Sequence, residues 1–250
     1  ELTPVNRISL GAQSFSQQNL NSLERLGSRE SIYRAVALLK QFGFTEFNLD
    51  LIFAIPGQSE SQMLQDLAEV ASLSPTHISS YNLTLKPGHA LYSKLPKEDF
   101  VADLYEKMVS QLESYGYKQY EISNFAKPEA SCEHNLLYWS GGDFLGLGPS
   151  AASRFFIDGV FHHRKQWSDF GKYLEQKNFS EVPFEKSTWS QTCLEATFLE
   201  LRKNSGIELK KFVKRYGYNP SLAKQFSLFL KEGLVAKEGN YLWLTRKGRL

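Results

Sequence analysis

The chain has 250 residues, of which 14% are aromatic and 22% charged, and its formal net charge is +2, a composition typical of a folded globular protein. We find no apolar run long enough to cross a membrane and no basic-then-apolar leader, so we expect no membrane insertion. Two cysteines, Cys132 and Cys193, are too few for a disulfide scaffold, and we therefore expect a cytoplasmic protein.

Three apolar, strand-like runs occupy residues 6–14, 47–56 and 77–85. Each is followed by a helical pattern, and these patterns begin near Ser28, Ser59 and Phe100. This alternation predicts parallel strands covered by helices. Three such units cannot close an eight-unit barrel. We therefore expect a sheet that is open or completed by other sequence, and we interpret the chain as the later part of a longer protein.

Polar residues lie toward the carboxyl ends of these runs. They are Gln13, Asp50 and Thr84, and Arg25 follows the first run. Ligands bind at the carboxyl ends of strands in folds of this class. Gln and Asp can bond hydroxyl groups, and Arg can pair with a carboxylate. We expect one shared ligand site, although each residue alone could cap a helix or face water.

These four residues and five ordered phrases resemble a known family. The phrases are NLDLIFAIPGQ, HISSYNLTLKPG, YEISNFA, HNLLYW and GLGPSAAS. They are similar to the later half of the radical S-adenosylmethionine (SAM) proteins called oxygen-independent coproporphyrinogen III oxidase-like, and within that family to its heme chaperones. The resemblance covers residues 6–153 and, more loosely, the C-terminal region.

The resemblance implies a fold and a set of cofactor contacts. The fold is α/β, the later part of a partial (βα)6 barrel with a parallel sheet. Gln13 and Asp50 are then expected to contact the SAM ribose, Arg25 the SAM carboxylate, and Thr84 to lie near the adenine.

The sequence departs from the family pattern at the iron–sulfur site. The family holds a [4Fe-4S] cluster through a CxxxCxxC loop, which this chain lacks. We therefore expect the cluster ligands outside this chain, and no radical chemistry from the chain alone. Gly27 and Ala152 also stand where relatives have His.

His134 lies in the phrase HNLLYW, which the resemblance links to heme binding. Imidazole is a good axial ligand for iron, and Tyr138 and Trp139 could pack on a porphyrin. The alternative is a structural His beside two aromatics that fill a domain seam. Cys132 is a second candidate ligand, as a thiolate.

The pattern changes after about residue 187, where helices precede a strand pair that turns at Gly239. This order is the outline of a winged helix. Residues 201–250 carry 12 Lys and Arg against 3 Asp and Glu, which invites a nucleic-acid hypothesis. The candidate recognition helix has no Arg or Asn for reading bases, so we favour a lid or docking role.

The sequence thus predicts three parts, with boundaries at residues 1–126, 127–186 and 187–250. They are a partial barrel, a linking region and a winged-helix-like domain. The adjacent His162 and His163 lack a third metal ligand, and we expect them in a solvated loop.

The leading function is a SAM- and [4Fe-4S]-dependent heme chaperone that binds heme or porphyrin and delivers heme to an acceptor protein. The alternative is oxygen-independent coproporphyrinogen III oxidase.

Overall fold

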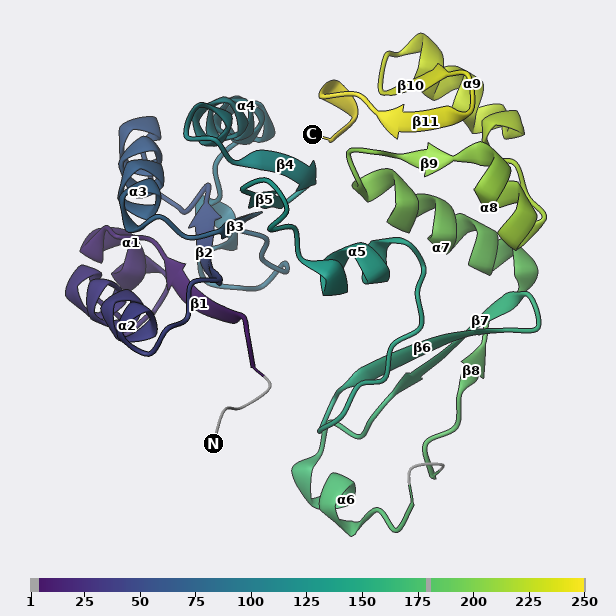
Figure 1. The fold of residues 1–250 in the computed structure, drawn as a ribbon, viewed down its shortest axis with the longest axis horizontal. Coiled ribbons are helices and arrows are strands. Elements are labelled where there is room, and N and C mark those ends of the chain that lie inside the picture. Colours follow the sequence, from purple (N-terminus) through teal and green to yellow (C-terminus); the bar gives the residue numbers. More distant parts are fainter. Residues whose placement is uncertain (1–4, 179–180, 250) are drawn as a thin grey trace. The chain divides into compact units, whose positions relative to one another are not determined.

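The computed structural model describes residues 5–178 and 181–249 and contains two compact units (Figure 1). The first unit ends at Ser131 and the second runs from Cys132 to Arg249. The three-part division of the sequence stays a prediction. None of the helices in the described ranges has the length and apolar content needed to cross a membrane.

The first unit is built on a five-stranded sheet in the order β1-β2-β3-β5-β4. Strands β1, β2 and β3 are parallel, as the sequence predicts, and β5 is antiparallel to both β3 and β4. The strand bounds are β1 Ile8–Gln13, β2 Phe47–Phe53, β3 His77–Asn82, β4 Lys118–Glu121 and β5 Asn124–Ala126.

Helices connect the parallel strands, and two of them begin where the sequence predicts. The Ser28 and Ser59 side chains each form a capping box at the start of a helix, with Ser31 and Gln62 as the respective partners. The helix bounds are α1 Gln17–Ser22, α2 Arg29–Gln41, α3 Glu60–Leu73 and α4 Glu98–Ser114.

The two faces of this sheet differ in character. On one face, alternate residues of β2 pack against the apolar sides of α2, α3 and α4. The buried cluster includes Leu49, Leu51 and Phe53 from the strand and Val36, Leu67 and Met108 from the helices. The intervening residues Asn48 and Asp50 point to the other face, because successive side chains of a strand alternate. Parallel strands are usually apolar on both faces, so a polar face is a departure that favours a ligand site.

The second unit contains two small antiparallel sheets, in the orders β6-β7-β8 and β10-β11-β9. The β10-β11-β9 sheet packs with α7, α8 and α9 around a separate buried core. This core includes Phe161, Ile207, Phe212, Phe226 and Leu242. The bounds are α5 Glu133–Trp139, β6 Ala152–Ile157, β7 Val160–Lys165, α6 Phe170–Glu175, β8 Glu185–Lys186, α7 Trp189–Arg202, β9 Ile207–Glu208, α8 Leu209–Tyr216, α9 Lys224–Lys231, β10 Val235–Glu238 and β11 Tyr241–Leu244.

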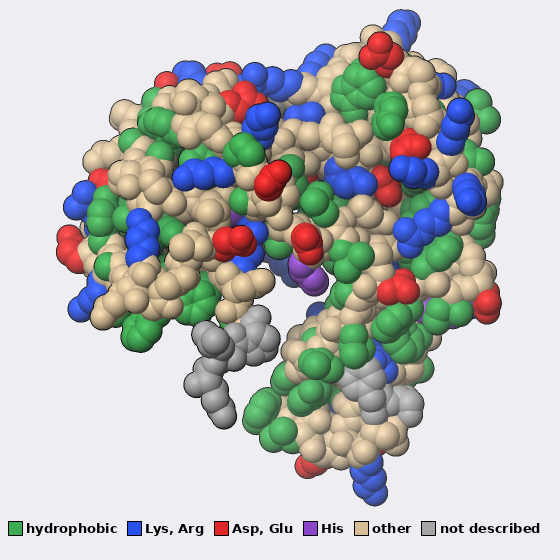
Figure 2. Space-filling view, in the orientation of Figure 1, with side chains coloured by type: hydrophobic (Ala, Val, Ile, Leu, Met, Phe, Trp, Pro, Cys, Tyr) green, Lys and Arg blue, Asp and Glu red, His purple; other side chains and the backbone are tan. Residues whose placement is uncertain are grey.

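The C-terminal elements confirm the predicted order of helices followed by a hairpin. Two elements have no counterpart among the predicted strands and helices: residues 118–126 form the β4–β5 hairpin and residues 133–139 form α5. The prediction that His162 and His163 lie in a solvated loop is wrong, because both residues lie within strand β7. On the face shown in Figure 2, Lys and Arg side chains of the second unit are spread among acidic and apolar ones rather than gathered in one stripe.

Candidate functional site

Gln13 and Asp50 come together on the polar face of the first sheet. Gly11 of β1 is the direct register partner of Asp50 in β2. A Cβ atom built on Gly11 would lie 2.6 Å from the Gln13 side-chain nitrogen, so the Gln13 amide lies over Gly11. The end of the Gln13 amide thus occupies the space that the missing Gly11 side chain leaves, next to the strand position of Asp50.

The Asp50 carboxylate is held by two neighbours on the same face. Asn48 donates from Nδ2 to Asp50 Oδ1 across 2.7 Å, and the Ser9 hydroxyl donates to Asp50 Oδ2 across 3.2 Å. Asn48 Nδ2 also donates to Ser9 Oγ across 2.7 Å. Each carboxylate oxygen thus has one bond within the sheet, and its remaining lone pairs stay available to a ligand.

A second layer of polar side chains lies behind Asn48. His77 Nδ1 is 2.7 Å and Ser79 Oγ is 3.2 Å from Asn48 Oδ1, while His77 Nε2 is 2.8 Å from the Tyr120 hydroxyl oxygen. Burial lowers the pKa of His77 to about 3, and the positive charge of Arg7 adds to this effect. His77 is therefore neutral at physiological pH.

Tyr81 borders the same face and is partly exposed. Burial raises the pKa of its hydroxyl, and the negative charges of Asp50 and Glu121 raise it further. Tyr81 is two positions along β3 from Ser79, the register partner of Asp50, and so lies on the same face. Its phenol stays protonated at neutral pH and can donate a hydrogen bond.

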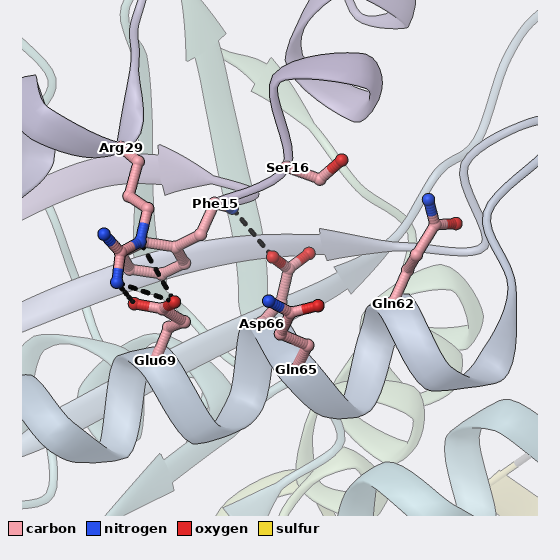
Figure 3. A pocket seen from close by; sticks show the side chains of 7 residues that line it. All are labelled: Phe15, Ser16, Arg29, Gln62, Gln65, Asp66 and Glu69. Atoms are coloured by element: carbon pink, nitrogen blue, oxygen red, sulfur yellow. Dashed lines mark hydrogen bonds and ion pairs between the residues drawn. The ribbon is translucent and has the colours of Figure 1, made fainter.

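The end of β1 is fixed from the helix side by Asp66 of α3. Its carboxylate accepts from the Ser14 hydroxyl across 2.6 Å and from the Phe15 N–H across 2.8 Å, as Figure 3 shows for Phe15. Burial raises the pKa of Asp66, and these two hydrogen bonds oppose the rise. Gln13 directly precedes this anchor and has a φ of 64°, a conformation rare for residues other than glycine. Asp66 thus helps to hold the backbone of Gln13 in this unusual conformation.

The structure does not bring Arg25 and Thr84 into contact with this pair. Arg25 lies on the exposed loop between α1 and α2, and its guanidinium has no partner among the described residues. Gln17 Nε2 donates to Gly27 O of that loop across 3.5 Å, which ties the loop to the chain just after β1. Thr84 is exposed beyond β3, with its hydroxyl 3.4 Å from the Asn82 carbonyl oxygen.

His134 is exposed on α5 in the second unit, and Cys132 stands at the N-cap position of this helix without a side-chain capping bond. The two neighbouring aromatics pack within their own unit. The Tyr138 ring is 4.8 Å from that of Trp139 and 5.2 Å from that of Phe144. The imidazole is therefore accessible, while Tyr138 and Trp139 anchor the helix that carries it.

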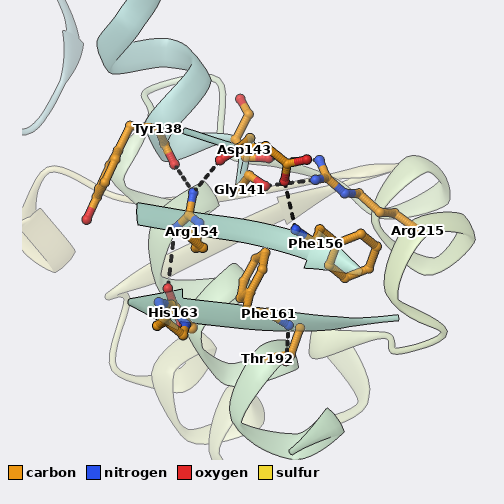
Figure 4. Close-up of polar contacts among 12 residues, drawn as sticks. Tyr138, Gly141, Asp143, Arg154, Phe156, Phe161, His163, Thr192 and Arg215 are labelled. Carbon is orange, nitrogen blue, oxygen red and sulfur yellow. Dashed lines mark hydrogen bonds and ion pairs between the residues drawn. The ribbon is translucent and has the colours of Figure 1, made fainter. Parts of the chain in front are cut away.

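Two arginines hold the carboxyl end of α5. Arg154 donates to the carbonyl oxygens of Tyr138 and Gly142, each across 3.0 Å, and Arg215 donates to those of Ser140 and Gly141 across 3.0 and 2.8 Å (Figure 4). These bonds add to the backbone bonds at the helix end, where the Gly141 N–H already donates to the Tyr138 carbonyl oxygen across 3.1 Å. Arg154 is buried and pairs with Glu195 at 3.3 Å, so α5 is firmly attached to the second unit.

The polar face fits the adenosyl part of SAM in its donor and acceptor chemistry. Asp50 offers free lone pairs for ribose hydroxyls, and Gln13 offers both a donor and an acceptor. The residues do not fit an iron–sulfur cluster. Cys132 and Cys193 lack the required number and spacing, and burial raises the pKa of the Cys193 thiol. In the described ranges, no three His, Cys, Asp or Glu side chains could hold a metal ion.

Five polar residues of this face were missed by the sequence reasoning: Ser9, Asn48, His77, Ser79 and Tyr81. A signal existed, because polar residues recur every second position in FNLDLIF and in HISSYN. That alternation marks a strand with a polar face even where the other face is buried.

Several known proteins have sequences related to this chain. Residues 192–250 match the HemN C-terminal domain family. The chain is 30% identical to the heme chaperone HemW of Bacillus subtilis, covering 98% of this chain and 67% of that protein. It is 39% identical to HemW of Escherichia coli over 72% of this chain and 51% of that protein. It thus spans about half to two thirds of the length of these relatives.

A solved structure shows the same fold. The structure of coproporphyrinogen III oxidase (HemN) from Escherichia coli, described as a radical SAM enzyme, matches with a TM-score of 0.76 at 22% identity, covering 98% of this chain and 62% of that one. This likeness confirms the predicted α/β fold class. The sequence relatives lead to one conclusion: the chain belongs to the family of the heme chaperone HemW.

Proposed function

We propose that this chain forms the later part of a heme chaperone that binds SAM and heme. The observation that carries this proposal is the polar sheet face, where the Gln13 amide lies over Gly11, the register partner of Asp50. The names of the HemW relatives support the heme part of the proposal.

In the proposed SAM site, Asp50 accepts hydrogen bonds from the ribose hydroxyls and the Gln13 amide contacts the same sugar. Arg25 has no side-chain partner among the described residues. In the proposed complex the α1–α2 loop closes over SAM, so that the Arg25 guanidinium pairs with the SAM carboxylate. Thr84 lies at the adenine end. A [4Fe-4S] cluster belongs to the same site in the complete protein, with ligands other than the two cysteines of this chain.

In the proposed heme site, His134 supplies the axial imidazole, and Cys132 is the alternative ligand. Arg154 and Arg215 keep α5 in place, so that the imidazole projects from a fixed helix. Delivery then requires an acceptor protein, whose docking surface would lie near α5.

A second candidate function is the oxidative decarboxylation of coproporphyrinogen III, since the structural relative is an oxidase. The two functions predict different results for the full-length protein. A chaperone should develop a Soret band when heme is added, and should leave coproporphyrinogen unchanged in the presence of SAM and a reductant. Loss of coproporphyrinogen without heme binding would favour the oxidase instead.

A further inference from the structure

The hydrogen bonds on the polar sheet face run in one direction and end at Asp50. A carboxylate can only accept, so Asn48 must present its NH2 group to Asp50 and its oxygen to His77. The His77 Nδ1 must then carry the proton, and Nε2 must accept from the Tyr120 hydroxyl. In this assignment each bond from Tyr120 through His77 and Asn48 to Asp50 joins one donor to one acceptor.

The order of this chain of bonds depends on a neutral imidazole. His77 and Asn48 are both buried, and the His77 ring packs at 5.5 Å from the Tyr120 ring. Since a neutral imidazole has one N–H, Tyr120 selects the tautomer that donates to Asn48. The Ser79 hydroxyl gives the same Asn48 oxygen a second donor. A flipped Asn48 amide would turn its oxygen toward Asp50 and its NH2 group toward the donor on His77, so both contacts would be lost.

We infer that Asn48 is a positioning residue for Asp50, and that His77 and Tyr120 fix the orientation of Asn48. This inference rests on the proposed function, in which Asp50 binds a ribose. With Oδ1 held by Asn48 and Oδ2 held by Ser9, the plane of the carboxylate is set before the ligand arrives. A carboxylate held in this way suits two adjacent hydroxyl donors, as a ribose diol presents them.

The first test measures SAM affinity by calorimetry on the full-length protein. Asn48→Leu keeps the side-chain volume but removes both donors, and we expect binding about tenfold weaker. His77→Leu should weaken binding about fivefold, by the same loss of orientation. His77→Asn keeps an N–H near the position of Nδ1, and should restore affinity to within about twofold of wild type.

Tyr117→Phe is the matched control in the same unit. It removes a buried hydroxyl that donates to the Pro75 carbonyl across 2.8 Å on another part of the fold. It should lower the melting temperature and leave SAM affinity unchanged. If folded Asn48→Leu and His77→Leu proteins bind SAM as tightly as wild type, the inference is overturned.

The second test needs no ligand. Long-range ¹H–¹⁵N spectra report which His77 nitrogen is protonated, and we expect Nδ1–H in the wild type and an increased Nε2–H population in Tyr120→Phe. An Nε2–H wild type would overturn the inference whether or not SAM binds. Failure of the wild-type protein to bind SAM would instead overturn the proposed function, and the tautomer would still decide whether Asn48 is oriented as inferred.

Discussion

Gly11 and Asp50 are direct partners in the parallel register of β1 and β2, and the glycine has no side chain to cover the carboxylate. The end of the Gln13 amide occupies the space that a Cβ atom of residue 11 would enter. The identity of residue 11 therefore controls both the space beside Asp50 and the position of Gln13.

Gly11→Ala should weaken SAM binding by about tenfold or more, because the methyl group displaces the Gln13 amide and narrows the space over Asp50. Folding should be little affected, since the displaced atom is the end of a flexible side chain and the alanine lowers the entropy of the unfolded state. Calorimetry with SAM and thermal melting separate the two effects. Gly171→Ala in the second unit is the control, and equal SAM affinity in the wild-type and Gly11→Ala proteins would contradict the site.

Asp66→Ala should destabilise the first unit. It removes the acceptor of the buried Ser14 hydroxyl and of the Phe15 N–H, and an unsatisfied buried group costs about 1–3 kcal/mol. Denaturant unfolding measures this loss. Glu69→Gln on the same helix removes the charge that pairs with the half-exposed Arg29 but keeps an acceptor for the Tyr33 hydroxyl, and should cost less stability than Asp66→Ala. Equal stability losses in the two variants would contradict an anchoring role for Asp66.

Much of the first unit can be predicted from its sequence because its signals are local. The capping boxes at Ser28 and Ser59 form within four residues of chain, and the parallel strands are marked by apolar runs between helices. The β4–β5 hairpin escapes prediction because its strands have only four and three residues, and pairing with β3 stabilises them. A short alternating run cannot reveal such a distant partner.

The candidate site is predictable to a smaller extent for the same reason. Gln13 and Asp50 stand out as polar residues in apolar runs, but their proximity depends on the register of β1 against β2. The role of Asn48 depends on contacts with Ser9 and His77, which are 39 and 29 positions away. Tertiary contacts of this kind have no signature in a single sequence.

The stability of the first unit should fall in mild acid because of His77. Its pKa is 6.5 in an unstructured chain and about 3 in the folded protein, so the unfolded state binds more protons between these values. The contribution is fully present above pH 6.5 and is lost as the pH falls toward 3. At about 1.4 kcal/mol per pH unit, acidification from pH 7 to pH 5 should cost about 2 kcal/mol.

Denaturant unfolding of the wild type and of His77→Asn at both pH values isolates the contribution of His77 to the pH dependence of stability. Asp66, Glu30 and Glu69 titrate in both proteins, so their effects cancel in the difference. On acidification, the free energy of unfolding of the variant should fall by about 2 kcal/mol less than that of the wild type. Parallel pH curves would show that His77 is not buried as a neutral group.

Heme should bind through His134 in the full-length protein. The imidazole is exposed at the start of α5, while Tyr138 and Trp139 are occupied in packing contacts and Arg154 and Arg215 hold the end of the helix. His134→Ala should therefore remove or shift the Soret band without unfolding the second unit. SAM affinity should stay unchanged, because the proposed SAM residues lie on the strands and loops of the first unit.

Two further variants decide what a negative result means. Cys132→Ala changes the heme spectrum only if a thiolate is the ligand, and His89→Ala, at an exposed histidine of the first unit, controls for nonspecific binding of heme by surface imidazoles. If His134→Ala binds heme with the spectrum and affinity of the wild type, then His134 is not the ligand. The chaperone proposal would then depend on Cys132, and an unchanged spectrum in that variant as well would leave the oxidase as the better-supported function.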